Sequence, residues 1–172
     1  MGGDIDIQMT TDMELVRSIL VEPDIWERAA EDGIDQDTWY PGYNSMTAWL
    51  LCIEDDDVIG VILLHTDTAV SLKMHPYLRK EHRQKGRVMM ASFYKWLLEN
   101  TELETVNKIN TVIPEYQKKV INFAKKVGFH KEGVSRESCR KNGQLYGQQN
   151  MGITRKEIEE YLYVPIIIQK TA

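Results

Sequence analysis

Cysteine is scarce in this 172-residue chain. Only Cys52 and Cys139 are present, too few for a disulfide framework, so a reducing, cytoplasmic setting is expected. No apolar run approaches the ~18 residues of a membrane-spanning helix, and the acidic start of the chain is unlike a signal peptide. No Cys/His spacing predicts a zinc site, and no Gly-x4-Gly-Lys-Ser/Thr motif predicts an NTPase. We therefore expect no bound metal ion and no membrane-spanning segment.

The chain is long enough for one domain spanning residues 1–172. Its charge is unevenly divided along the sequence. Residues 1–70 contain 16 acidic and 2 basic side chains, whereas residues 71–172 contain 10 acidic and 19 basic ones. Such a division suits a protein that binds an anion on one side and a cation on the other. The alternative is that the two halves simply attract each other in the fold.

Hydrophobic periodicity predicts a mixed α/β fold. Alternating apolar residues favour strands at 4–9, 47–53, 58–64, 70–75, 105–113, 134–140 and 144–153. Pro76 is expected to end the strand before it. Helices are expected after the capping box at Thr11, over 24–30, from Gly86 to about residue 100, before Gly128, and from the second capping box at Thr154 to residue 162. Asn142-Gly143 predicts a tight hairpin turn.

A cationic loop joins the strand at 70–75 to the next helix, and its five cations are Arg79, Lys80, Arg83, Lys85 and Arg87. Gly86 stands where the helix begins, so a ligand can approach the backbone closely. The first turn of a helix also leaves N–H groups free to bind an anion. The pattern predicts a phosphate site, and the alternative is a solvated basic loop.

Three stretches resemble the GNAT superfamily of acyl-CoA-dependent N-acetyltransferases. Arg83-Gln-Lys-Gly-Arg-Val88 is similar to its Arg/Gln-x-x-Gly-x-Gly/Ala signature, with Val88 at a position that is usually Gly or Ala. The run from Gln117 to Phe129 is similar to the helix Asn-x-x-Ala-Ile-x-Leu-Tyr-x-Lys-x-Gly-Phe, with Gln117 in place of Asn and Ala124 in place of Tyr. Residues 128–155 resemble the final hairpin of ribosomal-protein-type N-acetyltransferases.

This resemblance implies a mostly antiparallel sheet of about six or seven strands flanked by helices. It also implies acetyl-CoA as cosubstrate, with the pyrophosphate held at the cationic loop and the pantetheine arm along the strand that ends at His75. The cofactor-binding residues implied are Met74, His75, Arg83, Gln84, Lys85, Gly86, Arg87, Val88, Met89 and Gln117.

Acetyl transfer to an amine requires that the amine lose a proton and that the thioester be held near it. The resemblance implies direct attack without a covalent enzyme intermediate. Candidate bases are His75, His65 or an acidic residue acting through water, and Tyr116 is the candidate acid because Ala124 replaces the usual Tyr. Because of these departures, the alternative is a GNAT-fold binding or structural module without catalysis.

The acceptor is predicted to be a primary amine, either on a small cationic molecule or at a protein N-terminus. The loop at 33–45 and residues just before it could form one wall of its site, through Trp26, Trp39, Tyr40, Tyr43, Glu31, Asp32, Asp35 and Asp37. The aromatic residues could equally pin the loop to the core. Nucleic-acid binding is not expected, and the chain is predicted to be a monomer or a homodimer. The apolar tail at 161–172 either packs back as a strand or meets another subunit.

Overall fold

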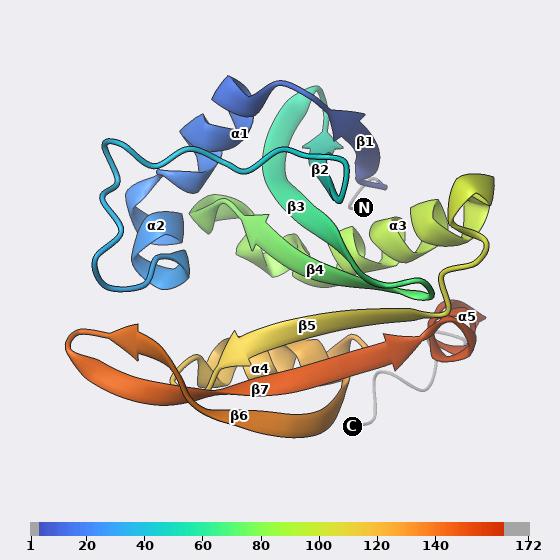
Figure 1. The fold of residues 1–172 in the computed structure, drawn as a ribbon. Helices are drawn as coiled ribbons and strands as arrows, with labels where there is room; N and C mark the ends of the chain where they lie inside the picture. The colour runs from blue at the N-terminus through green and yellow to red at the C-terminus, as the bar shows by residue number, and fades with distance from the viewer. Residues whose placement is uncertain (1–3, 164–172) are drawn as a thin grey trace.

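The computed structural model describes residues 4–163 and places seven strands and five α-helices in that part of the chain (Figure 1). The strands are β1 (Asp6–Thr10), β2 (Thr47–Glu54), β3 (Asp57–Thr68), β4 (Ser71–Leu78), β5 (Lys108–Pro114), β6 (His130–Lys141) and β7 (Gln144–Thr154). The helices are α1 (Met13–Leu20), α2 (Pro23–Ala29), α3 (Gly86–Glu99), α4 (Lys118–Lys126) and α5 (Arg155–Tyr163). Two 3₁₀ helices, η1 (Lys80–Lys85) and η2 (Thr101–Leu103), flank α3. The predicted fold class is confirmed.

The strands form one sheet in the order β1-β2-β3-β4-β5-β7-β6, and all neighbours are antiparallel except β4 and β5. The parallel pairing of β4 with β5 covers only Ser71–Lys73 against Lys108–Asn110. Beyond it each strand stays paired on its other side, β4 with β3 as far as Leu78 and β5 with β7 as far as Pro114. The sheet therefore divides into two halves that separate toward the ends of β4 and β5 (Figure 1).

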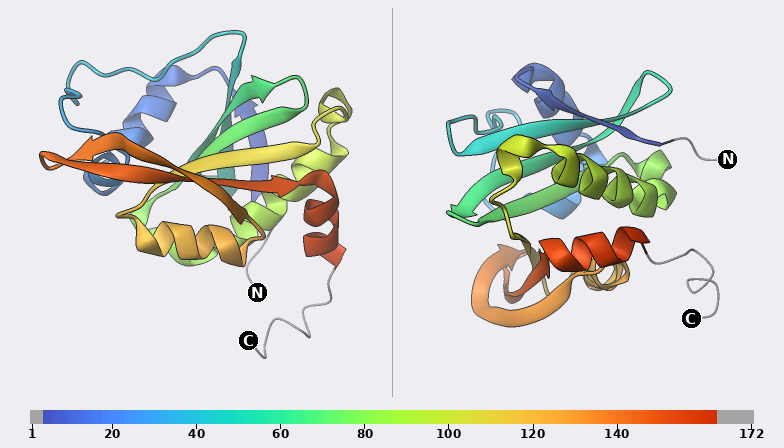
Figure 2. Two further views of the ribbon diagram at one scale, coloured as in Figure 1. Left: turned by 60° about the horizontal axis from the view of Figure 1, so that its bottom comes forward. Right: turned by 90° about the vertical axis from the view of Figure 1, so that its right-hand side faces the viewer.

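Helices cover both faces of the sheet, and each face has its own apolar core. On one face α1 and α2 bury Val16, Ile19 and Ile25 against Trp49 and Val61. On the other face α3, α4 and α5 form the main core with strand residues such as Leu50, Ile62, Met74, Ile109 and Ile153. Figure 2 shows α4 and α5 below the strands in its left view. Alternation of side chains along each strand sends neighbouring residues into the two cores.

Local signals in the sequence set several boundaries as predicted. Gly128 ends α4 with φ of +100°, and Asn142 and Gly143 form the β6–β7 turn with φ of +52° and +77°. At the start of α5, the Thr154 backbone N–H donates to Glu157 Oε2 at 2.8 Å and the Glu157 N–H donates to Thr154 Oγ1 at 3.3 Å, which is the predicted capping box.

Three local predictions are wrong. β4 does not end before Pro76 but runs to Leu78, because residues after Lys73 have no partner on the β5 side and a missing N–H there costs no sheet bond. Asp12, and not Thr11, caps α1, since its side chain accepts from the Leu15 N–H at 3.0 Å. The cationic segment is not an irregular loop, because most of it forms η1 and runs directly into α3.

The C-terminal prediction is only partly within the described residues. Tyr161 and Leu162 belong to α5 and pack on the main core, with the Tyr161 ring 5.5 Å from that of Tyr94. Residues 164–172 of the predicted tail lie outside the described residues. No helix in the described part of the chain is both long and apolar enough to cross a membrane. The single-domain prediction and the oligomeric state remain predictions.

Candidate active site

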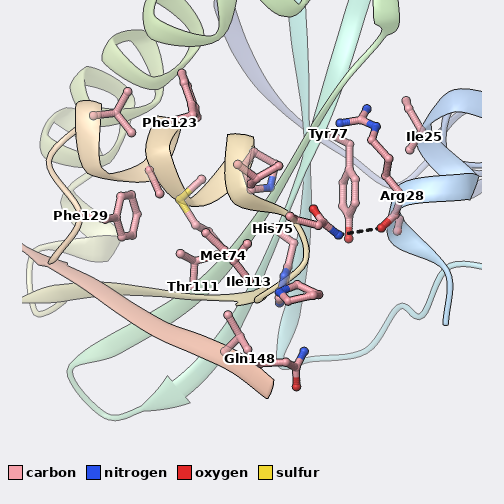
Figure 3. Close-up of a pocket in the computed structure, with 18 of the residues that line it drawn as sticks. Ile25, Arg28, Met74, His75, Tyr77, Thr111, Ile113, Phe123, Phe129 and Gln148 are labelled. Atoms are coloured by element: carbon pink, nitrogen blue, oxygen red, sulfur yellow. Dashed lines mark hydrogen bonds between the residues drawn. The ribbon is translucent and has the colours of Figure 1, made fainter. Parts of the chain in front are cut away.

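A cavity of about 310 Å³ lies where β4 and β5 separate, as the close-up in Figure 3 shows. Because the gap between the two strands passes through the sheet, residues from both faces of the sheet line the cavity. The inner end is apolar and is formed mainly by Met74, Met90, Ala124, Val127 and Phe129. The outer end carries the polar side chains Arg28, Glu31, His75, Tyr116, Gln117 and Gln148.

Helix α2 and the segment after it close one side of this cavity. Ile25 and Arg28 of α2 line the cavity, and so does Glu31. The Gln117 Nε2 group donates to the Arg28 carbonyl oxygen at 2.8 Å, which ties the start of α4 to the last turn of α2 (Figure 3).

The tip of the β6–β7 hairpin also binds this segment. Lys141 Nζ donates to the carbonyl oxygens of Glu27 and Ala30, at 2.6 and 3.1 Å. The Asp32 carboxylate accepts from the Asn142 and Gly143 N–H groups at 2.9 and 2.7 Å. These backbone donors lower the Asp32 pKa, because they favour the charged carboxylate. The two separated halves of the sheet are thus bridged across the cavity.

Two histidine rings stack on neighbouring strands at the cavity wall. His75 of β4 lines the cavity, and His65 of β3 lies against it with ring centroids 5.5 Å apart and planes 6° from parallel. Their Nε2 atoms are 3.4 Å apart. Burial lowers the His75 pKa to about 4, helped by the nearby His65 and Lys73. At neutral pH His75 is therefore uncharged and free to accept a hydrogen bond.

Two tyrosines at the cavity hold their phenol protons at neutral pH. Burial raises the Tyr77 pKa to about 12. It also raises the Tyr116 pKa, and Cys139, Glu31 and Asp32 act in the same direction while Gln117 opposes them. The Tyr116 ring packs edge-on against Tyr146 with centroids 4.8 Å apart, which fixes its position at the cavity rim. Both phenols can act as hydrogen-bond donors to an occupant.

The cationic segment 79–87 follows β4, and three of its five cations pair with carboxylates. Arg79 pairs with Glu22 at 2.8 Å, Arg83 pairs with Asp24, and Lys85 pairs with Glu54. Lys80 and Arg87 form no ion pair with another residue of the described chain. The opposite charges of the two halves of the chain thus partly attract each other, as the alternative interpretation expected.

Gly86 has a packing role in addition to its position at the start of α3. A Cβ atom there would lie 3.0 Å from the Phe123 ring of α4, so the absence of a side chain lets α3 and α4 approach closely. Its N–H donates to the Arg83 carbonyl oxygen, because η1 continues into α3. This amide is therefore not one of the free donors that the sequence predicted at the helix start.

The structure brings four of the predicted site residues to the cavity, namely Met74, His75, Tyr116 and Gln117. His65 does not line the cavity but contacts His75, which does. Arg83, Gln84, Lys85, Arg87 and Val88 lie along η1 and the first turn of α3, outside the cavity lining, and Met89 is buried in the main core. Their role in binding a phosphate stays a prediction.

Sequence reasoning missed Arg28, Tyr77, Thr111 and Gln148, which line the cavity from α2, β4, β5 and β7. Only Tyr77 had a usable signal, since it stands two residues after His75 and therefore on the same face of β4. The other three are brought to the cavity by the separation of the strands and by the docking of α2.

The predicted aromatic and acidic wall is only partly present. Trp39 packs on the core of α1 and α2 and contacts Trp26 with ring centroids 5.5 Å apart, so it pins the loop, as the alternative expected. The Tyr40 hydroxyl donates to Glu14 at 2.8 Å, and Tyr43 is 58% exposed. Glu31 alone of this group lines the cavity.

No protein-family model matches the chain, and no curated protein matches its sequence. Solved structures do match it in fold. A spermidine N-acetyltransferase from Vibrio cholerae, solved with CoA and spermine, is 14% identical over 91% of this chain and 98% of its own, with a TM-score of 0.71. A protein described as a phosphinothricin N-acetyltransferase is 15% identical over 88% of this chain and 98% of its own, with a TM-score of 0.67. The chain therefore has the fold of the GNAT N-acetyltransferases.

Proposed function

We propose that the protein is an acetyl-CoA-dependent N-acetyltransferase that acetylates a primary amine. The observation that carries this proposal is the cavity between β4 and β5, which is apolar at its inner end and polar at its outer end. An acyl thioester and an amine need such a site, because the amine must lose a proton while both reactants are held in contact.

The residues around the cavity suit the pantetheine arm of coenzyme A. The backbone of β4 after Lys73 has no strand partner on its cavity side, so its polar groups are available to the amides of the arm. Ala124, where many GNAT proteins carry Tyr, keeps the inner wall small and apolar. Arg83 and Arg87 would hold the pyrophosphate, and Arg83 would first have to leave Asp24.

The remaining residues support direct attack by the amine. His75 is uncharged at neutral pH and stands at the cavity wall, where it can accept the proton of the ammonium group. Tyr116 keeps its proton at neutral pH and can give it to the departing thiolate. Glu31 at the outer end can attract a cationic acceptor. Spermine in the solved relative makes a small cationic amine the favoured acceptor, and a protein N-terminus is the alternative.

One observation favours a second candidate, a GNAT-fold module that has lost catalysis. Three of the five cations of segment 79–87 are held by carboxylates, Arg83 among them, and Ala124 leaves the usual Tyr position without an acid. Such a module would bind acetyl-CoA without transferring the acetyl group, or would bind none.

A cytoplasmic location stays a prediction.

Calorimetric titration with acetyl-CoA tests the proposal, followed by a screen of primary amines for release of the CoA thiol. We expect saturable binding that weakens at least tenfold in Ala124→Phe, because the larger ring occupies the inner end of the cavity. Arg87→Glu should weaken binding too, since it places a negative charge at the phosphates. Lys156→Glu is the matched control, because this residue is an exposed cation on α5 that pairs with Glu160 at 3.9 Å.

The outcomes of the titration and the amine screen separate the two candidates. Binding with amine-dependent thiol release supports the enzyme. Binding without release for any amine supports the inactive module. No binding at millimolar acetyl-CoA contradicts the enzyme and leaves only a module that binds no acetyl-CoA, and equal binding by wild type and Ala124→Phe removes the cavity as the cofactor site.

A further inference from the structure

We propose that His75 and His65 form a two-residue proton relay, which takes the proton of the acceptor amine at the cavity and releases it to solvent beside Asp67. This inference rests on the proposed acetyl transfer and adds the route by which the proton leaves. Its first support is position, because His75 lines the cavity whereas His65 does not. The contact between their Nε2 atoms, 3.4 Å apart, joins the two rings.

The register of the sheet creates this contact. His75 pairs with Leu63 and Lys73 pairs with His65, so the two histidines occupy diagonal positions on one face of β3 and β4. Diagonal neighbours on antiparallel strands are within reach of long or aromatic side chains. Two neutral imidazoles can share a hydrogen bond between their Nε2 atoms only if one ring is protonated there and the other is not. The pair is thus set up to pass one proton.

The surrounding charges favour movement of the proton outward. The charged groups that face the pair are Lys73 and Asp67, joined by an ion pair of 3.2 Å. Lys73 disfavours a positive charge on both rings, but Asp67 favours it on His65. Asp67 is itself held in place by Asn110, whose Nδ2 group donates to it at 2.7 Å. An imidazolium is therefore better stabilised at His65 than at His75.

The difference in burial between the two rings also favours movement of the proton from His75 to His65. His75 is the more deeply buried ring, and burial is the main cause of its lowered pKa. A base with so low a pKa is poor at storing a proton but suited to handing it on. His65 is closer to water, where the proton can leave.

The acceptor R–NH3⁺ gives a proton to His75 Nδ1, His75 Nε2–H gives its proton to His65 Nε2, and His65 Nδ1–H releases a proton to water. The freed amine lone pair attacks the thioester carbonyl, so that a C–N bond forms and the C–S bond breaks. Of the two protons that remain on nitrogen, one stays in the product amide, and the other is lost as the C–S bond breaks and replaces the proton that Tyr116 gives to the departing thiolate. Each ring ends in the opposite tautomer and is reset by proton exchange with water.

The test compares His65→Gln with wild type on two primary amines, one strongly basic and one so weakly basic that it is unprotonated at neutral pH. We expect kcat for the strongly basic amine to fall at least about tenfold at neutral pH and to recover as the pH approaches the pKa of that amine. The weakly basic amine needs no relay and should lose little. Calorimetric affinity for acetyl-CoA should be unchanged. His130→Gln is the control, because His130 is an exposed histidine that contacts Glu157 on α5. Equal losses for both amines, or no loss for either, would overturn the relay.

A second measurement is independent of turnover. Imidazole ¹⁵N shifts followed across pH should show His75 neutral down to about pH 4 in the wild type. In His65→Gln the His75 pKa should rise, because a neighbouring positive charge is removed. An unchanged His75 titration would show that the rings are not coupled and would overturn the relay even if the protein is an active acetyltransferase. Failure of wild type to bind acetyl-CoA would instead be a failure of the proposed function.

Discussion

Asp24→Asn is expected to tighten CoA binding. Asp24, in the first turn of α2, pairs with Arg83 of η1 and also with Arg28 at 3.0 Å. If Arg83 binds the pyrophosphate, the ligand must first displace the Asp24 carboxylate. Asparagine keeps the shape of the side chain but removes its charge, so Arg83 becomes available without that competition.

The size of the expected gain in CoA affinity follows from the solvent exposure of the Arg83–Asp24 ion pair. The Arg83 and Asp24 side chains are 39% and 31% exposed, so the pair resembles a surface ion pair more than a buried one. Such pairs are worth about 0.2–1 kcal/mol. Freeing Arg83 should therefore lower the Kd for CoA by at most about fivefold. The gain should shrink as salt is added, because the charges lie within reach of screening ions.

Calorimetry with CoA and with pantetheine separates this effect from a general one. Pantetheine lacks the pyrophosphate and should bind wild type and Asp24→Asn equally. Glu27→Gln is the matched control, since it removes one carboxylate from the same helix, where Glu27 contacts Lys141 at 3.6 Å. The assignment of Arg83 to the phosphate is wrong if Asp24→Asn leaves CoA affinity unchanged. It is equally wrong if the gain persists in an Arg83→Ala background.

Two further predictions concern stability. Gly128→Ala should lower the free energy of unfolding by at least about 1 kcal/mol, measured by urea denaturation, because φ is +100° and the new Cβ would lie 2.8 Å from Ile153 Cδ1. Gly143→Ala has a positive φ but no such neighbour, so a smaller loss is expected, and equal losses would contradict the packing argument. His75 should make the protein less stable in acid. Its folded pKa of about 4 lies below the ordinary 6.5, so the unfolded chain binds more protons than the folded protein between these two pH values. Stability is therefore lost as the pH falls through that window. Relative to His75→Asn, wild type should lose roughly 2 kcal/mol more between pH 7.5 and pH 5, and parallel losses would show that His75 is not held neutral by the fold.

The helices and strands, and most of their ends, follow from local signals in the sequence. Alternation of apolar residues placed all seven strands, since one face of each strand must be buried. Gly128, Asn142-Gly143 and the Thr154 capping box acted as predicted because each satisfies a local conformational need or a backbone group close by in the chain. The cationic segment 79–87 and the helix that follows Gln117 could also be recognised by their resemblance to a known superfamily.

The way in which these elements meet depends on contacts that form only in the folded protein. The cavity exists because β4 and β5 share three residue pairs and then separate, a feature that periodicity cannot reveal. Arg28 reaches it because Gln117 and the hairpin tip fix α2 across the gap, and the distance of 3.4 Å between His65 and His75 depends on strand register. The neutralisation of Arg83 by Asp24 likewise joins residues 59 positions apart. Local sequence encodes hydrogen bonds and burial within a few residues, whereas ligand geometry and proton routes depend on contacts between distant segments.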